Sequence, residues 1–244
     1  MGIFMPTAKY IQVAQEIKKR IKSGQYHPDE LLPDQETLAK EFGVSRLTVK
    51  KAIDGLERKG LVYKQSGLGT YVSAPIPIKS KTDTPANFFM GLDTEMGKGR
   101  VTSQVLHFTV EFPSPEIQKN LSLKKNEPVY DIIRLRLLDG EPFVIEHTFM
   151  PLKTVPDLDE EILSKSVYHY IHHDLNLKFG RAYRRILASK PDDLDKKFLH
   201  AAPDDPMLEL EQLVWLTNGT PVEYSYSRSR YDSRSYTVFE NNRF

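Results

Sequence analysis

The sequence predicts an α+β protein in two parts, a small helical N-terminal module and a C-terminal α+β domain with an antiparallel sheet. Two observations carry this prediction. Apolar residues between Glu41 and Leu61 recur with the period of a helix, and the second half of the chain repeats a hairpin pattern. Residues 75–86 are poor in large apolar side chains and are interrupted by proline, which indicates a linker. We therefore expect domains at residues 1–74 and 87–244.

The stretch from Glu41 to Leu61 predicts a helix with one buried face. Its apolar residues follow the spacing i, i+3, i+4 and i+7, namely Val49, Ala52, Ile53 and Leu56. Upstream, Asp34 is placed to cap a shorter helix, and Gly43 supplies the turn between the two. Two short helices joined by a glycine turn, the second starting with hydrogen-bond donors, are typical of a helix-turn-helix. The same residues would also suit an ordinary buried helix with a solvated face.

A further helix and a hairpin complete this module. An amphipathic helix comes first, with Ile11, Ala14, Ile17 and Ile21 on one face. After the helix pair, residues 61–65 and 70–73 form two short strand patterns around a glycine-rich tip. No helix follows Gly67 and Gly69 to receive a pyrophosphate, which argues against a dinucleotide site. Three helices and a hairpin together make a winged helix-turn-helix.

Length and composition limit the class of protein. The chain has 244 residues, enough for two domains, and 39% hydrophobic with 27% charged residues is the composition of a soluble globular protein. It has no cysteine, no membrane-length apolar run and no signal-peptide pattern, so we expect a cytoplasmic protein. Residues 1–74 hold 12 Lys and Arg against 8 Asp and Glu, and the remainder holds 22 against 25. A basic front end suits a module that binds a polyanion.

The second half contains a duplicated helix–hairpin unit. Each copy begins with a short helix, opening at Pro115 or Pro191, and continues into a long hairpin. The hairpin turns are Asp139-Gly140 in the first copy and Asn218-Gly219 in the second, and both dipeptides favour tight turns. We expect the two copies to build one antiparallel sheet, with a cleft where they meet.

Two arginines fall on one face of a strand in the first copy. Arg134 and Arg136 share that face by the period of two, and burying them is costly unless an anion or a carboxylate meets them. What faces them depends on the turn. A two-residue turn places Phe143 and Ile145 opposite, whereas a three-residue loop with a bulge places Val144 and Glu146 opposite. The sequence leaves both registers open, and structural salt bridges are the alternative to an anion site.

Several motifs of the N-terminal module keep their spacing across its elements. Leu32-Pro33, the run Gly43-Val44-Ser45-Arg46-Leu47-Thr48-Val49 and Gly67-x-Gly69-Thr70-Tyr71-Val72 resemble the DNA-binding domain of GntR-family bacterial transcription regulators. The resemblance covers residues 6–73 and implies a homodimer on a palindromic DNA operator. The residues expected to contact DNA are Ser45, Arg46, Thr48, Lys50, Lys51, Gln65, Gly67 and Gly69. The chain departs from the family at Asp34-Gln35-Glu36, where Ser-Glu-Arg is usual, and at Lys50, which replaces an arginine.

The body, over residues 83–240, resembles the UTRA ligand-binding domain of the HutC subgroup, whose fold is like that of chorismate lyase. The resemblance implies that the arginine pair and a preceding loop hold the phosphate of a sugar, while other positions contact the sugar. The expected effector-binding residues are Gly91, Leu92, Asp93, Thr94, Arg134, Arg136, Glu146, Ser166, Tyr168, Glu223 and a tyrosine near Tyr226 or Tyr231. Asp93 stands where serine or threonine is common, and a carboxylate beside a phosphate is unfavourable unless it caps the next helix.

Other chemistry fits less well. His169, His172 and His173 lack the further ligands of a metal site, and the sequence has no nucleophile elbow or P-loop. We therefore expect no catalytic residues, metal or cofactor. The predicted function is a DNA-binding transcription regulator, usually a repressor, released by a small metabolite such as a sugar phosphate. The alternatives are a chorismate-lyase-like enzyme, or a regulator that responds to a non-phosphorylated or amino-acid-derived acid.

Overall fold

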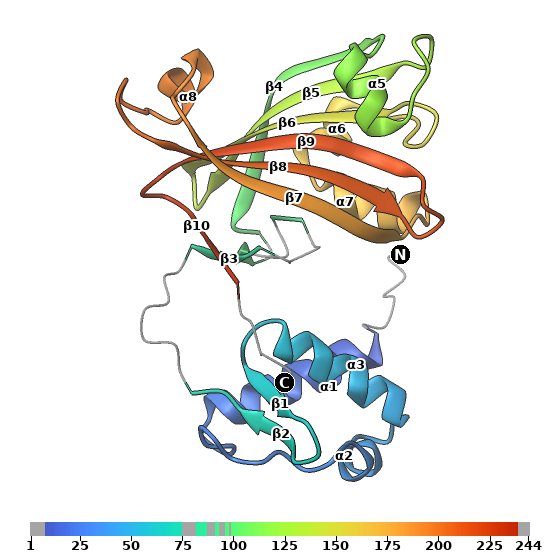
Figure 1. The fold of residues 1–244 in the computed structure, drawn as a ribbon, viewed down its shortest axis with the longest axis vertical. Helices are drawn as coiled ribbons and strands as arrows, with labels where there is room; N and C mark the ends of the chain where they lie inside the picture. Colours follow the sequence, from blue (N-terminus) through green and yellow to red (C-terminus); the bar gives the residue numbers. More distant parts are fainter. Residues whose placement is uncertain (1–7, 75–81, 87–90, 93–95, 98, 239–244) are drawn as a thin grey trace. The chain divides into compact units, whose positions relative to one another are not determined.

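A computed structural model of the chain describes residues 8–74, 82–86, 91–92, 96–97 and 99–238. The chain divides into two compact units at residues 80 and 81, and the second unit ends at Tyr236 (Figure 1).

The first unit contains three helices and a two-stranded hairpin. Its elements are α1 (Lys9–Lys22), α2 (Gln35–Phe42), α3 (Arg46–Glu57), β1 (Val62–Gln65) and β2 (Gly69–Val72). Each helix turns one apolar face inward, and Ile17, Leu38 and Ile53 are fully buried in a shared core with Val62 of the hairpin. The predicted winged helix-turn-helix is confirmed.

Capping side chains and one turn fix the helix pair. The Asp34 carboxylate accepts a hydrogen bond from the Thr37 backbone N–H at 2.7 Å, and the Ser45 hydroxyl accepts one from Thr48 at 3.2 Å. These bonds satisfy donors that the first turn of a helix leaves free. Gly43 ends α2 in the left-handed conformation, with a φ of 60°. The start of α3 is therefore held in place before any DNA is present.

The hairpin of the first unit has a tip that needs glycine. At Gly69 the backbone has a φ of 124°, and a Cβ atom there would lie 2.7 Å from Cδ1 of Leu31. A side chain at this position would have to displace Leu31, and the positive φ disfavours every residue except glycine.

The second unit is built on a six-stranded antiparallel sheet. The large sheet consists of β4 (Val101–Glu111), β5 (Val129–Leu138), β6 (Glu141–Pro151), β7 (Phe179–Ser189), β8 (Met207–Leu216) and β9 (Pro221–Arg230). Two short strands, β3 (Asp83–Pro85) and β10 (Ser235–Thr237), lie outside it. The helices of the second unit are α5 (Pro115–Leu121), α6 (Glu160–Ser164), α7 (Val167–His169), the π-helix η1 (Tyr170–Asp174) and α8 (Asp193–Phe198). The large sheet has the order β4-β5-β6-β9-β8-β7, and β3 pairs with β10 in a separate ribbon.

The sheet order confirms the predicted duplication. The first copy runs β4, α5, β5, β6, and the second copy runs β7, α8, β8, β9. The two copies join where β6 pairs with β9 at the middle of the sheet. The ribbon was not predicted: β3 lies inside the segment that the sequence indicates as a linker. Residues 83–85 therefore belong to the folded second unit.

The register of the first hairpin resolves the two alternatives left open by the sequence. Asp139 and Gly140 form a two-residue turn in which both φ angles are positive, 53° and 90°. Between Pro142 and Val144 the register then shifts by one residue, so that Phe143 is an extra residue in β6. As a result Glu146 lies opposite Arg134, the pairing expected from a bulge, although the turn itself has two residues.

Each face of the large sheet has its own cover (Figure 1). Helices α5 and α8 pack on one face through clusters around Phe149 and Ile145. On the other face, α6, α7 and η1 cover the cluster around Ile132 and Met150. The ribbon of β3 and β10 contributes Thr84 and Tyr236 to the lining of a cavity on that second face, between the sheet and its cover.

Candidate functional site

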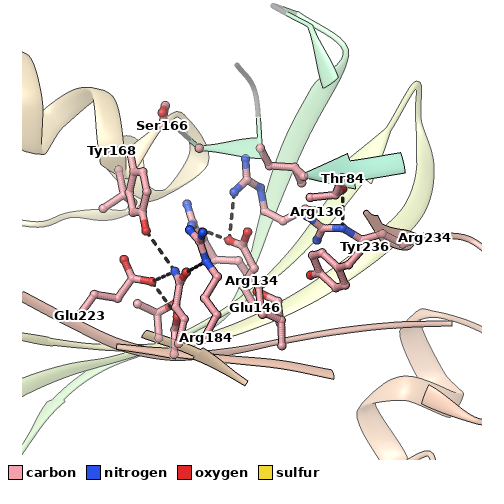
Figure 2. A pocket seen from close by; sticks show the side chains of 18 of the residues that line it. Thr84, Arg134, Arg136, Glu146, Ser166, Tyr168, Arg184, Glu223, Arg234 and Tyr236 are labelled. Atoms are coloured by element: carbon pink, nitrogen blue, oxygen red, sulfur yellow. Dashed lines mark hydrogen bonds and ion pairs between the residues drawn. The ribbon is translucent and has the colours of Figure 1, made fainter. Parts of the chain in front are cut away.

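The cavity of the second unit lies over the junction of the two repeated copies. Its volume is about 100 Å3, several times what a single buried water needs. Four adjacent inner strands, the start of α7 and the ribbon all contribute side chains (Figure 2). The charged and hydroxyl-bearing residues labelled in that view are Thr84, Arg134, Arg136, Glu146, Ser166, Tyr168, Arg184, Glu223, Arg234 and Tyr236.

Two buried arginines share one carboxylate oxygen at the centre of the site. Oε2 of Glu146 accepts hydrogen bonds from Nη2 of Arg134 at 2.7 Å and from Nη1 of Arg136 at 3.0 Å (Figure 2). Nη1 of Arg134 also donates to the Leu163 carbonyl at 3.2 Å. The two guanidinium groups expose only 9% and 5% of their side-chain surface. One oxygen of Glu146 therefore bonds two desolvated cations.

This arrangement shifts the pKa values of Glu146 and Arg134. Burial raises the pKa of Glu146, but the charges of Arg136 and Arg134 outweigh burial and lower the pKa to about 2. Burial lowers the pKa of Arg134, and the neighbouring charge of Arg136 lowers it further against the attraction of Glu146. Nε of Arg134 is buried and has no hydrogen-bond partner among the described residues. The Arg134 guanidinium thus has unused capacity to bind an anion.

A second polar network lies on the β8–β9 side of the cavity. Oε1 of Glu223 accepts hydrogen bonds from Nε2 of Gln212 at 2.7 Å and from the Ser225 hydroxyl at 2.6 Å. The same Gln212 amide donates to the Tyr168 hydroxyl at 3.1 Å. Burial and the negative charge of Glu223 raise the pKa of Tyr168 well above its usual value, which keeps the phenol protonated. This side of the cavity offers hydroxyl groups and a buried carboxylate as hydrogen-bond partners.

Two arginines that were not predicted from the sequence also reach the cavity. Arg184 projects from β7 and donates from Nη1 to the Ala86 carbonyl at 2.9 Å. Arg234 precedes β10, and its Nε donates to the Thr84 hydroxyl at 3.1 Å. The period of two along the predicted strand 179–187 was a signal that could have identified Arg184. Arg234 lies outside any periodic pattern, so its position depends on the ribbon.

Most of the predicted effector-binding residues come together at this cavity. Those that line it are Gly91, Leu92, Arg134, Arg136, Glu146, Ser166, Tyr168 and Glu223. Asp93 and Thr94 lie outside the described residues.

Neither Tyr226 nor Tyr231, the two positions predicted for an effector-binding tyrosine, lines the cavity. Tyr226 lies on the opposite sheet face, where its hydroxyl donates to Glu116 of α5 at 3.2 Å, and Tyr231 is 55% exposed in the turn after β9. Tyr236 lines the cavity instead, together with Tyr168.

The predicted DNA-contact residues line two grooves at the surface of the first unit. A groove between α3 and the hairpin is lined by Lys50, Lys51, Gln65, Gly67 and Gly69. A second, shallower groove between α2 and α3 is lined by Ser45, Arg46 and Thr48 together with Glu36. The Thr48 hydroxyl lies 2.9 Å from that of Ser45, so both serve the helix cap as well.

Charge on this surface is arranged in two zones. The acidic pair Asp54 and Glu57, further along α3, holds Lys64 of β1, with the Lys64–Glu57 bond at 2.6 Å. Lys50 and Lys51 at the start of α3 remain exposed. Glu36, one of the departures noted in the sequence, pairs with Lys40 at 3.3 Å.

Within the described part of the chain, no group of three or more acidic or histidine side chains is arranged to hold a metal ion. In the same part, no helix is both long enough and apolar enough to cross a membrane.

Both units of the chain match known protein families. Residues 9–72 match the family model of bacterial regulatory proteins of the gntR family, and residues 97–234 match the UTRA domain. The HTH-type transcriptional regulator GmuR of Bacillus subtilis is 38% identical over 224 residues, which cover 92% of this chain and 94% of the relative.

Solved structures support the same assignment. The crystal structure of the possible transcriptional regulator YydK from Bacillus subtilis is 30% identical, with a TM-score of 0.78 over 96% of this chain and 100% of that chain. The effector-binding domain of the B. subtilis trehalose repressor TreR is also 30% identical, with a TM-score of 0.53 over 59% of this chain and 99% of that chain. Regulators of this kind bind DNA through the first domain and a small-molecule effector through the second. The chain therefore belongs to the GntR family of bacterial transcription regulators, with a winged helix-turn-helix followed by a UTRA domain as in the HutC subgroup.

Proposed function

We propose that this regulator is a repressor that leaves its operator when a phosphorylated sugar binds the cavity of the UTRA domain. The observation that carries the proposal is the pair of buried guanidinium groups of Arg134 and Arg136 that share one oxygen of Glu146. Nε of Arg134 is buried and has no hydrogen-bond partner among the described residues, so this pair of desolvated cations favours a further anion. A phosphate offers several strong acceptor oxygens, which match the geometry of guanidinium donors.

The charge of the whole cavity supports an anionic effector. Among the described residues that line it, four are arginines and two are glutamates. If Asp93 were counted with them, the cations would still be in excess by one. A neutral sugar would gain nothing from this excess, whereas a phosphate would be attracted through a medium of low dielectric constant.

The other side of the cavity supports a hydroxyl-rich partner. Oε2 of Glu223 is buried without a hydrogen-bond partner among the described residues, and Tyr168 and Ser166 line the same cavity. Sugar hydroxyl groups can donate to the carboxylate and accept from the tyrosine or serine hydroxyls. A molecule with a phosphate at one end and hydroxyl groups at the other would therefore satisfy both networks.

The repressor role and the homodimer are part of the same proposal. The relative TreR is named a trehalose repressor, and its effector-binding domain resembles the second unit. A two-fold homodimer would place one α3 in each half of a near-palindromic operator, which is the usual arrangement of helix-turn-helix regulators.

Paired ligands would test the effector class. We would measure the unfolding of the protein with each sugar and its phosphate, such as trehalose and trehalose 6-phosphate or glucose and glucose 6-phosphate, and with amino-acid-derived acids. Trp215 in β8, the one tryptophan of the sequence, reports on the second unit. A ligand at 100 times its Kd adds about 2.7 kcal/mol to the free energy of unfolding. We expect one phosphorylated sugar to stabilise the protein and its unphosphorylated counterpart to have little effect.

A matched pair of variants makes this test specific. Arg134→Ala should abolish the stabilisation by the phosphorylated sugar. Arg185→Ala removes an exposed arginine of β7 that pairs with Glu211 on the opposite face of the sheet, and it should leave the stabilisation unchanged. Stabilisation by a neutral sugar, or by an amino-acid-derived acid alone, would exclude the phosphate and favour the alternative effectors.

A further inference from the structure

The centre of the exposed face of α3 is occupied by a leucine. Leu47, the second residue of the helix, is 61% exposed. The opposite face is buried and consists of Val49, Ala52, Ile53 and Leu56. Because successive residues of an α-helix are about 100° apart, Leu47 lies about 160° around the helix axis from Val49. Its side chain therefore leaves the helix directly away from the core of the domain.

The neighbours of Leu47 are hydrogen-bond donors. Lys50 and Lys51 follow it by three and four residues and are exposed, so they lie beside it on the same face. Arg46 precedes it and is also exposed. The acidic residues of the helix lie further along, where Asp54 and Glu57 hold Lys64. The N-terminal part of α3 therefore presents an apolar centre with a basic surround.

An apolar side chain at this place has a specific use on DNA. Residues at the start of a recognition helix meet the edges of bases in the major groove. Thymine alone presents a methyl group there, and leucine has no group that can hydrogen-bond the other base edges. We infer that Leu47 is a specificity-determining residue that reads the methyl group of one thymine in each operator half-site. The lysines and the arginine around it bind the phosphates and bases nearby.

Removal of single methyl groups from the DNA would test this inference. The preferred site of the parent protein is first selected from randomised duplexes, and each thymine is then replaced singly by deoxyuridine, which lacks only the 5-methyl group. Affinities are measured by fluorescence anisotropy for the parent and for Leu47→Ala. We expect the parent to lose about fourfold in affinity at one position of the half-site, the loss equivalent to one buried methyl-sized group. Leu47→Ala should show no loss at that position.

The wing supplies a matched control. Leu68, at the tip between β1 and β2, is 65% exposed, so Leu68→Ala removes a similar side chain from another part of the DNA-binding surface. This variant should keep the fourfold loss of the parent. Circular dichroism would check that both variants remain folded, as expected for exposed positions.

Three outcomes would overturn the inference. The parent and Leu47→Ala could respond alike at every thymine, the parent could be insensitive to all the substitutions, or only Leu68→Ala could lose the sensitivity. The effector takes no part in this experiment, so a failure here leaves the phosphate proposal untouched.

Discussion

Glu146 accepts hydrogen bonds from two buried guanidinium groups through one carboxylate oxygen. Its charge is retained in the cavity because Arg134 and Arg136 stabilise it more than burial destabilises it, which lowers its pKa to about 2. Breaking such a cluster leaves buried charge without compensation, which is costly even where the intact cluster contributes little net stability. The site is therefore sensitive to substitution at this residue, and to pH only below about 4.5.

The first prediction concerns the charge of Glu146. Glu146→Gln should lower the free energy of unfolding near neutral pH by about 3–5 kcal/mol, because it removes the buried negative charge that both Arg134 and Arg136 bond. In the parent, folding lowers the pKa from 4.5 to about 2, so the unfolded state takes up the proton first as the pH falls. The stabilising contribution is complete above about pH 4.5 and is lost as the pH falls towards 2.

Urea denaturation over this pH range, followed by the fluorescence of Trp215, measures the effect. The difference in stability between the parent and Glu146→Gln should narrow as the pH falls. Glu161→Gln is the control, because Glu161 forms an exposed pair with Lys165 and should give almost no difference at any pH. A constant gap between the parent and Glu146→Gln across the range would show that the charge of Glu146 is not the cause.

Single residues also show what could be predicted from the sequence. The period of two places Arg134 and Arg136 together without further information. Their partner Glu146 depends on a bulge at Phe143, which no local rule specifies, and the family resemblance supplied it. Tyr226 could have been excluded by counting, because Glu223 and Tyr226 are three positions apart on one strand and so face opposite ways.

At the scale of elements, one lysine bonds the wing to α3 in addition to the apolar core that they share. Lys64 of β1 bonds both Asp54 and Glu57, and only 23% of its side chain is exposed. Its positive charge offsets part of the negative charge of these two carboxylates beside the basic DNA-binding surface. Loss of this lysine would affect both the position of the hairpin and the local charge.

The second prediction is that Lys64→Met weakens binding to operator and to random DNA by a similar factor. Loss of one positive charge at this surface weakens the attraction to every phosphate backbone alike, and the freed hairpin costs about 1 kcal/mol of local stability. Gel shifts with both DNAs measure the effect. Lys165→Met, which breaks the exposed Glu161 pair in the second unit, should bind DNA as the parent does. A loss confined to operator DNA would mean that Lys64 reads bases instead.

Elements were predictable where a pattern extends over many residues. Helices α1 and α3 and the hairpins around Gly140 and Gly219 follow from periodicity and turn residues. The ribbon of β3 and β10 does not, because each strand has only three residues. Its pairing depends on contacts between residues 150 positions apart, such as the bond from Arg234 to Thr84. Such contacts leave no trace in a local pattern.

At the scale of the whole molecule, the third prediction is that the protein binds its ligand without converting it. The relatives are named as transcription regulators, and the carboxylates of the cavity are held by arginine, glutamine and serine donors. Incubation with chorismate and with the phosphorylated sugars should leave each compound intact, as measured by chromatography. Formation of a product that Glu146→Gln abolishes would instead support the enzyme alternative.

The connection between the cavity and the DNA-binding domain runs through the chain itself. Thr84 and Ala86, in and just after the first strand of the second unit, line the cavity and are bonded by Arg234 and Arg184. Residues 75–81, immediately before that strand, lead back to the wing. A ligand can act on operator binding only if it has different affinities for the two states of the protein. An anion that binds the arginines of the cavity would change their bonds to Thr84 and Ala86, and these two residues lie in the segment that continues the chain from the first unit.

The fourth prediction follows from this connection. Arg134→Ala combined with Arg136→Ala should retain operator binding, since neither residue belongs to the first unit, but should lose the release by the effector. In the parent, a coupling of about 1–3 kcal/mol would reduce operator affinity between about 5-fold and about 150-fold. Gel shifts at increasing concentrations of the compound that most stabilises the parent would measure both properties, with Arg185→Ala as the variant that keeps the response. If the double variant is still released normally, the two arginines are structural and the effector binds elsewhere in the domain.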